Sequence, residues 1–287
     1  MDILDWFPEG EILEHPVQKS GTVTLALPSH RWLLLPEEQL TDREQRLLQL
    51  LTDQVVNVPT DPWYRYLLEG QGDLPIPLKK LQVLHCHLTH AQAEGLASWL
   101  EMMRLLFPKY VTDFQVGSQD ILFILDQSQF YSVAAILRDT LSAMEYDFNL
   151  GMVLVLGQVW PIQAGLPLTT LVQAERAVIQ TWGYKDRISA VHRFSQLYLW
   201  ALNESIEELA TIKQGLHQLI SSQDQLEEII LALWDNAAVV TKAAQQLYLH
   251  RNSLQYKIDK WEELTGLSLK ELTDLSLCYQ VILEDHL

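Results

Sequence analysis

The chain has 287 residues and a mass of 33.1 kDa, is 48% hydrophobic and carries a formal net charge of −17. The hydrophobic fraction excludes an intrinsically disordered chain, and the length allows two or three domains with cores of their own. The strong negative charge argues against a protein that coats nucleic acid without sequence preference, because attraction to phosphates supplies most non-specific affinity.

Two further features concern the cellular compartment. The sequence has no run of about 18 apolar residues, as a membrane-spanning helix requires, and its start is acidic where a secretory signal peptide is basic. We therefore expect a cytoplasmic protein without a membrane partner, in which Cys86 and Cys278 are reduced thiols.

Residues 1–75 predict a small N-terminal α/β segment. Thr22–Leu27 and His30–Leu35 have the character of strands and are separated by a Pro-Ser pair, as in a hairpin. Thr41–Leu51 predicts a helix whose first residue forms a capping box with Glu44. We expect this region to sense a signal or to set the oligomeric state.

An aromatic cluster, Trp63–Leu67, precedes a loop with two glycines and two prolines between Gly70 and Pro77. A ligand cage is one interpretation of the cluster, but large aromatic side chains dominate ordinary cores, so core packing is favoured. The glycines and prolines mark the clearest domain boundary in the chain.

From residue 78 to residue 186, strands and helices alternate. The elements expected in chain order are a strand, a helix capped by Thr89, a hairpin of two strands, a helix, a strand and a helix: 81–88, 89–106, 110–116, 120–125, 133–144, 150–156 and 168–182. This order predicts an α+β domain with a ferredoxin-like sheet and helices on one face.

The hairpin at Gly117–Ile121, together with this order of elements, resembles a degenerate GGDEF-like domain. Active diguanylate cyclases of that family have Gly-Gly-Asp/Glu-Glu-Phe at the hairpin, whereas this chain has Gly-Ser-Gln-Asp-Ile. Phosphoryl transfer needs clustered carboxylates for Mg²⁺ and a close backbone approach to phosphates. One acid and one glycine do not supply both, so we expect a domain that dimerises or relays a signal.

Three histidines lie at or next to the first strand of this domain, and a metal site is one interpretation of them. His85 and His87 lie on one face of the predicted strand, and His90 lies at the start of the next helix. Three imidazoles can hold zinc or copper. The sequence offers no second cluster to complete a tetrahedral site, so histidines on a half-exposed strand face are the favoured interpretation.

The C-terminal third is predicted to be helical. Phe194–Leu219 is amphipathic and forms a connector at residues 190–222, and Asp224 is expected to cap the first helix of an all-α domain at residues 223–287. Within that domain, Thr241–Lys260 predicts two short helices joined by a tight turn. The second helix has one apolar stripe at spacing i, i+4 and i+7: Leu254, Ile258 and Trp261.

The side chains away from this stripe are hydrogen-bonding or cationic, as contact with DNA requires. Residues 241–260 contain four cations and one acid, a local balance of +3 inside acidic flanks. The expected DNA-binding residues, with Asn252 as the base contact, are Lys242, Arg251, Asn252, Ser253, Gln255, Tyr256, Lys257 and Lys260. His250 is expected to cap or to pack the start of the helix.

The segment Leu247–Ile258, followed by Trp-Glu-Glu-Leu-Thr-Gly-Leu-Ser-Leu, resembles the C-terminal helix-turn-helix of PucR-type regulators, which include the sugar-diacid (CdaR-type) regulators. The resemblance runs from about Leu226 to Leu283 and implies a GGDEF-like domain before the DNA-binding unit. Two departures stand out: Ala238-Val239 replaces a Gly-Asn pair, and Tyr248 lies in the turn where many such units have glycine.

These observations predict a bacterial transcription regulator that binds double-stranded DNA as a homodimer and responds to an effector of unspecified identity. No nucleotide-binding, nucleophile-elbow or zinc-protease motif occurs, so we expect no enzyme activity, catalytic residue, cofactor or metal. Two alternatives stay open: a scaffold protein whose helix-turn-helix no longer binds DNA, and a small nucleotide-handling enzyme built on the middle domain.

Overall fold

The computed structural model describes residues 7–13, 21–26, 32–37, 40, 41, 44, 61–90, 93–162, 166–184 and 188–283. The chain divides into two compact units, one made of Met1–Pro75 with Asp113–Leu122 and the other of Ile76–Thr112 with Phe123–Leu287. Among the described residues, no helix is both long enough and apolar enough to span a membrane. The finer division at residues 75, 186 and 222 stays a prediction.

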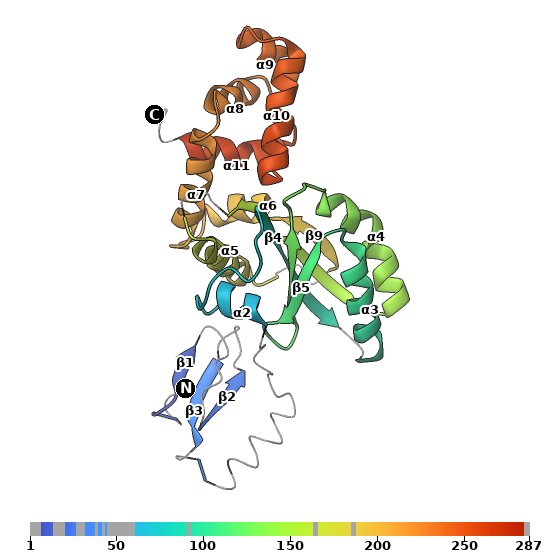
Figure 1. The fold of residues 1–287 in the computed structure, drawn as a ribbon, viewed down its shortest axis with the longest axis vertical. Coiled ribbons are helices and arrows are strands. Elements are labelled where there is room, and N and C mark those ends of the chain that lie inside the picture. The colour runs from blue at the N-terminus through green and yellow to red at the C-terminus, as the bar shows by residue number, and fades with distance from the viewer. Residues whose placement is uncertain are drawn as a thin grey trace. The chain divides into compact units, whose positions relative to one another are not determined.

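The first unit contains a three-stranded antiparallel sheet in the order β1-β3-β2 (Figure 1). Its strands are β1 (Glu11–Leu13), β2 (Thr22–Ala26) and β3 (Trp32–Pro36). The register pairs Thr22 with Pro36 and Ala26 with Trp32, which confirms the predicted pairing of two neighbouring strands. Side chains on both faces of β3 are buried, from Trp32 to Leu35.

The capping box at Thr41 is also present. The Thr41 N–H donates to Glu44 Oε2 at 2.9 Å, and the Glu44 N–H donates to Thr41 Oγ1 at 3.3 Å. Residues 42, 43 and 45–51 of the predicted helix lie outside the described residues. The capping box is therefore confirmed, whereas the helix that it was predicted to begin stays a prediction.

The aromatic cluster forms a short helix, α2 (Pro62–Leu67), that was not predicted. Asp61 begins it by accepting a hydrogen bond from the Trp63 N–H at 2.7 Å, and proline suits the first helical position. Trp63 and Tyr64 are buried, and the Tyr64 ring meets Phe114 edge-on at 5.4 Å. The interpretation as core packing is confirmed.

A second sheet has the strand order β5-β6-β4-β7-β9. The strands are β4 (Lys80–His90), β5 (Tyr110–Gln115), β6 (Asp120–Asp126), β7 (Gly151–Leu156) and β9 (Ala190–Arg193), and the short β8 (Trp160–Pro161) pairs with β4. Read from the other edge, the four strands β4 to β7 lie in the order β7-β4-β6-β5, so the first strand in the chain lies between the fourth and the third. This is the predicted ferredoxin-like order. Strand β9 extends this sheet by pairing with β7 in parallel.

Three helices accompany the sheet: α3 (Ala93–Leu106), α4 (Val133–Phe148) and α5 (Leu168–Trp182). Every residue of β7 is buried, so both faces of this strand are covered. Figure 1 shows α3 and α4 on one side of the sheet and α5 on the other. The expectation of helices on one face was therefore wrong. The expected cap at Thr89 was also wrong, because this residue continues strand β4.

The histidines of β4 differ in exposure, and His90 is the exposed last residue of this strand, not the start of the next helix as predicted. His85 is only 1% exposed, and His87 stacks on the ring of Tyr184 with 4.3 Å between centroids. In the parts of the chain that the structure describes, no group of three or more His, Cys, Asp or Glu side chains is arranged to hold a metal ion. The half-exposed strand face was thus wrong for His85, which belongs to the core.

Two connector helices follow, as predicted: α6 (Phe194–Ala201) and α7 (Leu209–Ser221). Both pack against α5 on one side and against the last helix of the chain on the other. The C-terminal helices are α8 (Leu226–Asp235), α9 (Val240–Gln246), α10 (Arg251–Thr265) and α11 (Leu272–Ile282). The all-α prediction is confirmed, but Asp224 does not cap α8, whose N-cap position is Gln225.

A buried carboxyl group lies between α5 and the sheet. Glu175 is 0% exposed, and its Oε1 atom accepts hydrogen bonds from the Gln158 N–H at 2.7 Å and from Trp160 Nε1 at 2.9 Å. Among the described residues, its Oε2 atom has no partner. Burial raises the pKa of this carboxyl to about 8, against the two hydrogen bonds that lower it. Glu175 is therefore protonated in the folded protein at neutral pH.

This protonation makes stability dependent on pH. The folded state keeps a proton that the unfolded chain releases above its ordinary pKa of 4.5, so the free energy of unfolding falls as the pH rises from about 4.5 to about 8. Glu175→Gln should flatten this fall and stabilise the protein by roughly 1–3 kcal/mol at pH 8. Urea unfolding at pH 5, 6.5 and 8 measures the effect, with the exposed Glu228→Gln as the control. Equal pH slopes for Glu175→Gln and the unaltered protein would contradict this account.

Candidate nucleic-acid interface

Helices α9 and α10 form the predicted helix-turn-helix. Ala243 and Ala244 are 0% and 3% exposed, so small side chains let the two helices approach closely. The predicted stripe is buried at all three of its positions: Leu254, Ile258 and Trp261. Because these side chains hold one face of α10 against the domain, the opposite face is presented to solvent.

The turns before and after α9 share one backbone geometry. After α8, the Ala237 N–H donates to the Trp234 carbonyl at 3.1 Å and the Ala238 N–H to Leu233 at 2.8 Å. After α9, the Tyr248 N–H donates to Gln245 at 3.2 Å and the next N–H donates to Ala244 at 2.9 Å. Both are Schellman motifs, which close a helix with a left-handed residue.

Neither motif has glycine at the left-handed position. Ala237 has φ 49°, Ala238 φ 62° and Tyr248 φ 54°. Left-handed backbone costs an L-residue roughly 1–2 kcal/mol, and the hydrogen bonds of each motif offset that cost. The two departures from the PucR-type sequence therefore leave the turn geometry intact.

The start of α10 is fixed by His250. This residue occupies the N-cap position, and its Nδ1 atom accepts a hydrogen bond from the Asn252 N–H at 3.2 Å. A neutral imidazole is required for that bond, because a protonated ring has no acceptor nitrogen. The expected capping role is confirmed.

The predicted residues divide into two groups. Those exposed on α10 are Arg251, Asn252, Ser253, Tyr256 and Lys260, and Lys242 is exposed on α9. The Lys260 ammonium lies 5.5 Å from the centre of the Tyr256 ring, as a cation–π pair on the open face, and 3.8 Å from Glu263 Oε2. The structure brings these six residues to the outer surface of the two helices.

The other two predicted residues are engaged within the domain. Gln255 donates from Nε2 to Asp259 at 2.7 Å, and Lys257 lies 3.1 Å from the Asp224 carboxylate. Both side chains are half-buried. Asp224 is 88% exposed, and surface ion pairs contribute about 0–1 kcal/mol, so Lys257 can exchange this partner for a phosphate.

Tyr248 is a surface residue that the sequence reasoning missed as a candidate. Its side chain is 96% exposed in the turn directly before α10. The sequence did offer a signal for this role, because a large aromatic residue in a turn is not needed for packing of the core. The phenol can donate to phosphate or stack against sugar, so Tyr248 joins the candidate surface.

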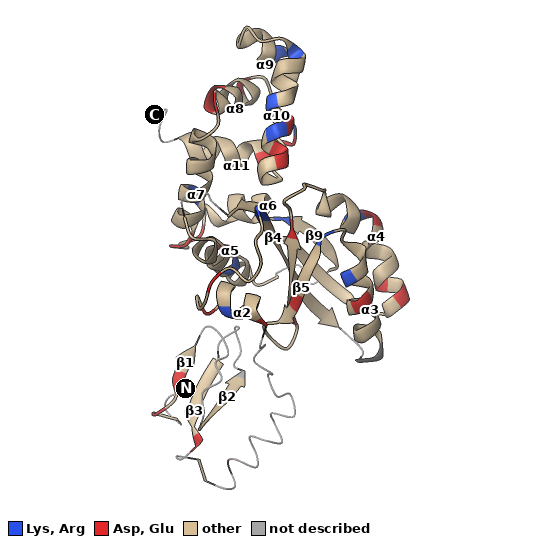
Figure 2. Ribbon diagram, in the orientation of Figure 1, with Lys and Arg blue, Asp and Glu red and all other residues tan. Residues whose placement is uncertain are grey.

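Charge is divided along these helices. Figure 2 shows Lys and Arg on α9 and as far as the middle of α10, and acidic residues on α8 and from the middle of α10 to its end. The acids at the end of α10 are Glu262 and Glu263, and the first turn of α8 contributes Glu227 and Glu228. Among the described helices α8 to α10, the open face of α9 and α10 is therefore the part that suits a polyanion.

The left-handed alanine at the end of α8 gives a test of this turn geometry. Ala237→Gly should stabilise the protein by roughly 0.5–1 kcal/mol, since glycine adopts φ 49° without strain but loses more chain entropy on folding. Ala244→Gly in α9 is the control and should destabilise the protein by about 1 kcal/mol. Urea unfolding of both variants measures these shifts, and shifts of the same sign would overturn the assignment.

Comparison with known proteins identifies the helical domain. Residues 226–280 match the PucR C-terminal helix-turn-helix domain. Along its length, the chain is similar to a "leucine-rich protein" of Streptococcus dysgalactiae subsp. equisimilis, with 27% identity over 286 residues, 99% of this chain and 100% of that one. It is also similar to the uncharacterized protein YxkF of Bacillus subtilis (strain 168), with 24% identity over 273 residues, 90% of this chain and 89% of that one.

A solved structure is similar as well. The regulator of polyketide synthase expression from Bifidobacterium adolescentis aligns with 86% of this chain and 96% of its own, with a TM-score of 0.37 and 12% identity. The matched domain begins at the first residue of α8 and contains both helices of the exposed face. Residues 226–280 therefore match a PucR C-terminal helix-turn-helix domain, and this match supports a DNA-binding transcription regulator.

Proposed function

We propose that this protein is a sequence-specific transcription regulator that binds double-stranded DNA as a homodimer, with α10 as the recognition helix. The observation that carries the proposal is the open face of α10 in a PucR-type domain. This face presents the amide of Asn252, the hydroxyl of Ser253 and the phenol of Tyr256, and it lies opposite the buried apolar stripe. Such groups read base edges in the major groove.

The position of each side chain suggests its role. Asn252 lies in the first turn of α10, where recognition helices contact bases, and its amide can pair with adenine through two hydrogen bonds. Ser253 and Tyr256 suit base edges or the sugar-phosphate backbone. The exposed cations suit phosphates: Lys242, Arg251 and Lys260. Gln255 and Lys257 can add contacts once they leave their acidic partners.

Base reading and electrostatics are separable by two substitutions. Asn252→Ala should weaken binding to the specific site by roughly 1–3 kcal/mol and change binding to scrambled DNA little. Lys260→Ala should weaken binding to both duplexes similarly and make the salt slope shallower by about 1. Titration of a selected and a scrambled duplex at several salt concentrations measures both, with the exposed Arg138→Ala of α4 as a control for lost positive charge.

Equal loss on both duplexes for Asn252→Ala, or no loss on either, would show that this residue does not read a base. Failure of the unaltered protein to retain any duplex from a genomic pool would instead favour the scaffold alternative. The net charge of −17 is the observation behind that alternative.

Dimer formation follows from the limited positive charge. A strip of +3 offers few phosphate contacts, so one unit should bind weakly, and a second unit on a half-site about one helical turn away supplies the remaining affinity. Light scattering should give about twice 33.1 kDa, free or on DNA. A mass near 33.1 kDa in both conditions would overturn the dimer.

We propose no catalytic role for the middle domain. The hairpin between β5 and β6 has one acid, Asp120, which is 7% exposed, and its carboxylate lies beside Gly117. A nucleotide and Mg²⁺ need several accessible carboxylates and an open backbone approach. Signal relay or assembly fits this hairpin better, and any small-molecule effector would act through such a role.

A further inference from the structure

The recognition helix is anchored at its C-terminal end by side chains of the middle domain. The last carbonyl groups of a helix have no partner inside the helix. Here the Gln158 side chain donates from Nε2 to the Thr265 carbonyl, and the Lys80 ammonium donates to the Glu263 carbonyl. Two donors from the β4–β7 region therefore complete the end of α10.

Gln158 is itself held firmly. It is 3% exposed, and its backbone N–H donates to the buried carboxyl of Glu175 at 2.7 Å. The preceding residue, Gly157, accepts a hydrogen bond from Gln82 Nε2 at 2.8 Å, and Gln127 donates to Gln82 at 3.0 Å. A network of buried amides thus fixes the position of Gln158 at the end of the sheet.

A second attachment lies beside the first. Asp274, at the start of α11, accepts hydrogen bonds from Arg193 Nη1 at 2.8 Å and from Ser195 Oγ at 2.6 Å. Its carboxylate is 1% exposed and also accepts from the Ser268 N–H at 3.0 Å. The end of β9 and the start of α6 therefore hold the helix that follows α10.

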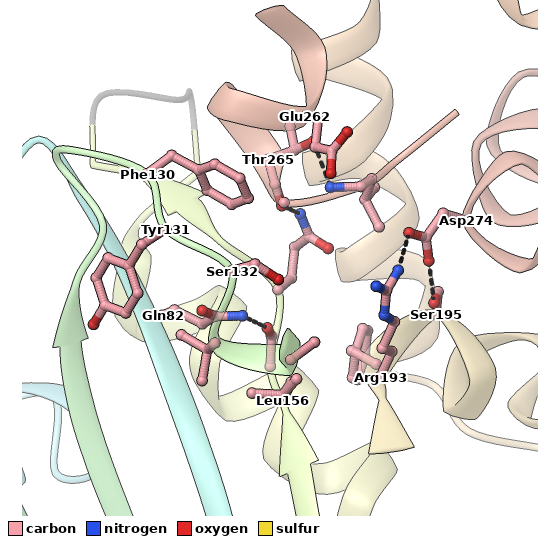
Figure 3. Close-up of a pocket in the computed structure, with 17 residues that line it drawn as sticks. Gln82, Phe130, Tyr131, Ser132, Leu156, Arg193, Ser195, Glu262, Thr265 and Asp274 are labelled. Carbon is pink, nitrogen blue, oxygen red and sulfur yellow. Dashed lines mark hydrogen bonds and ion pairs between the residues drawn. The ribbon is translucent and has the colours of Figure 1, made fainter. Parts of the chain in front are cut away.

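These attachments surround a polar pocket of about 50 Å³ (Figure 3). Figure 3 shows Gln82 and Ser132 on the sheet side, Glu262 and Thr265 on the α10 side, and the Arg193–Asp274 pair at the margin. A space of this size and polarity admits water. The middle domain and α10 are therefore joined in this region by separate hydrogen bonds around a pocket, and loss of one bond should measurably loosen the joint.

We propose that Gln158 and Lys80 are positioning residues for DNA recognition, which fix the direction of α10 relative to the middle domain. In a dimer, this direction determines how far apart the two recognition helices lie, and hence the spacing of half-sites that the protein accepts. The inference rests on the proposed function. It assigns to the ferredoxin-like domain the task of setting that spacing.

Hydrogen exchange of the intact chain tests the anchoring without DNA. Gln158→Met and Lys80→Met each remove one donor to α10, whereas Arg138→Met removes an exposed cation of α4 that is outside this hydrogen-bond network. Amides in the last turn of α10 should exchange roughly three- to tenfold faster in the first two variants, as loss of one hydrogen bond implies. They should be unchanged in the third. Lys80→Arg keeps a donor and should restore protection.

Half-site spacing tests the positioning role. Duplexes selected by the unaltered protein would be remade with one to five base pairs added or removed between half-sites. Gln158→Met and Lys80→Met should bind single half-sites normally. At altered spacings, their loss of affinity should be at least threefold smaller than that of the unaltered protein and of Arg138→Met.

Each result decides one point. Unchanged exchange in both donor variants would overturn the anchoring, and faster exchange with an unchanged spacing profile would overturn the positioning role. Should the unaltered protein bind no duplex, the proposed function fails together with the spacing claim, while the exchange comparison still decides whether the two side chains anchor α10.

Discussion

Helix α10 has to leave one face open to solvent while the backbone groups at both of its ends stay hydrogen-bonded. The His250 ring satisfies an N–H group at the start, and Gln158 and Lys80 satisfy carbonyl groups at the end. The stripe of Leu254, Ile258 and Trp261 then fixes the rotation of the helix about its own axis. With its ends and rotation set in this way, the helix can keep polar side chains on its open face.

The distribution of charge follows from the same constraint. In a protein with a net charge of −17, the open face of α9 and α10 has to exclude acids from its centre. Its acid Asp259 is turned toward Gln255 and Lys270, at 2.7 and 3.2 Å. Lys260 lies 3.8 Å from Glu263 in an exposed pair that a phosphate can replace, and Arg251 is exposed to solvent. Specific contacts then have to supply most of the affinity, because general attraction to phosphates is weak.

The end of the sheet nearest α10 is unusually polar for a buried region. Glu175, Gln82, Gln127 and Gln158 are each at most 9% exposed. Their hydrogen bonds form a connected set, and partly satisfied networks of this kind are costly in a low-dielectric interior. The raised pKa of Glu175 avoids part of that cost, because a neutral carboxyl loses less on burial than a carboxylate. Directional hydrogen bonds in this region fix the geometry of the joint with α10 more sharply than apolar packing would.

Local patterns in the sequence determined the elements that depend on neighbouring residues. The spacing of Leu254, Ile258 and Trp261 gave the buried face of α10, and the Thr41–Glu44 capping box formed as expected, since both signals act over a few residues. The alternation of elements from residue 78 also gave the ferredoxin-like strand order. The resemblance to PucR-type regulators agrees with the match of residues 226–280 to the PucR C-terminal helix-turn-helix domain.

Contacts between distant residues decided the rest. Strand β9 was not predicted, because its four residues form a strand only by pairing with β7. His85 is a core residue because helices cover both faces of the sheet. Lys257 was predicted to face DNA, yet Asp224, 33 positions earlier, engages it. The partners of α10 at Gln158 and Lys80 are more than 100 residues away in the chain. Periodicity within a segment cannot reveal such partners, since only the packed chain brings their atoms within hydrogen-bond distance.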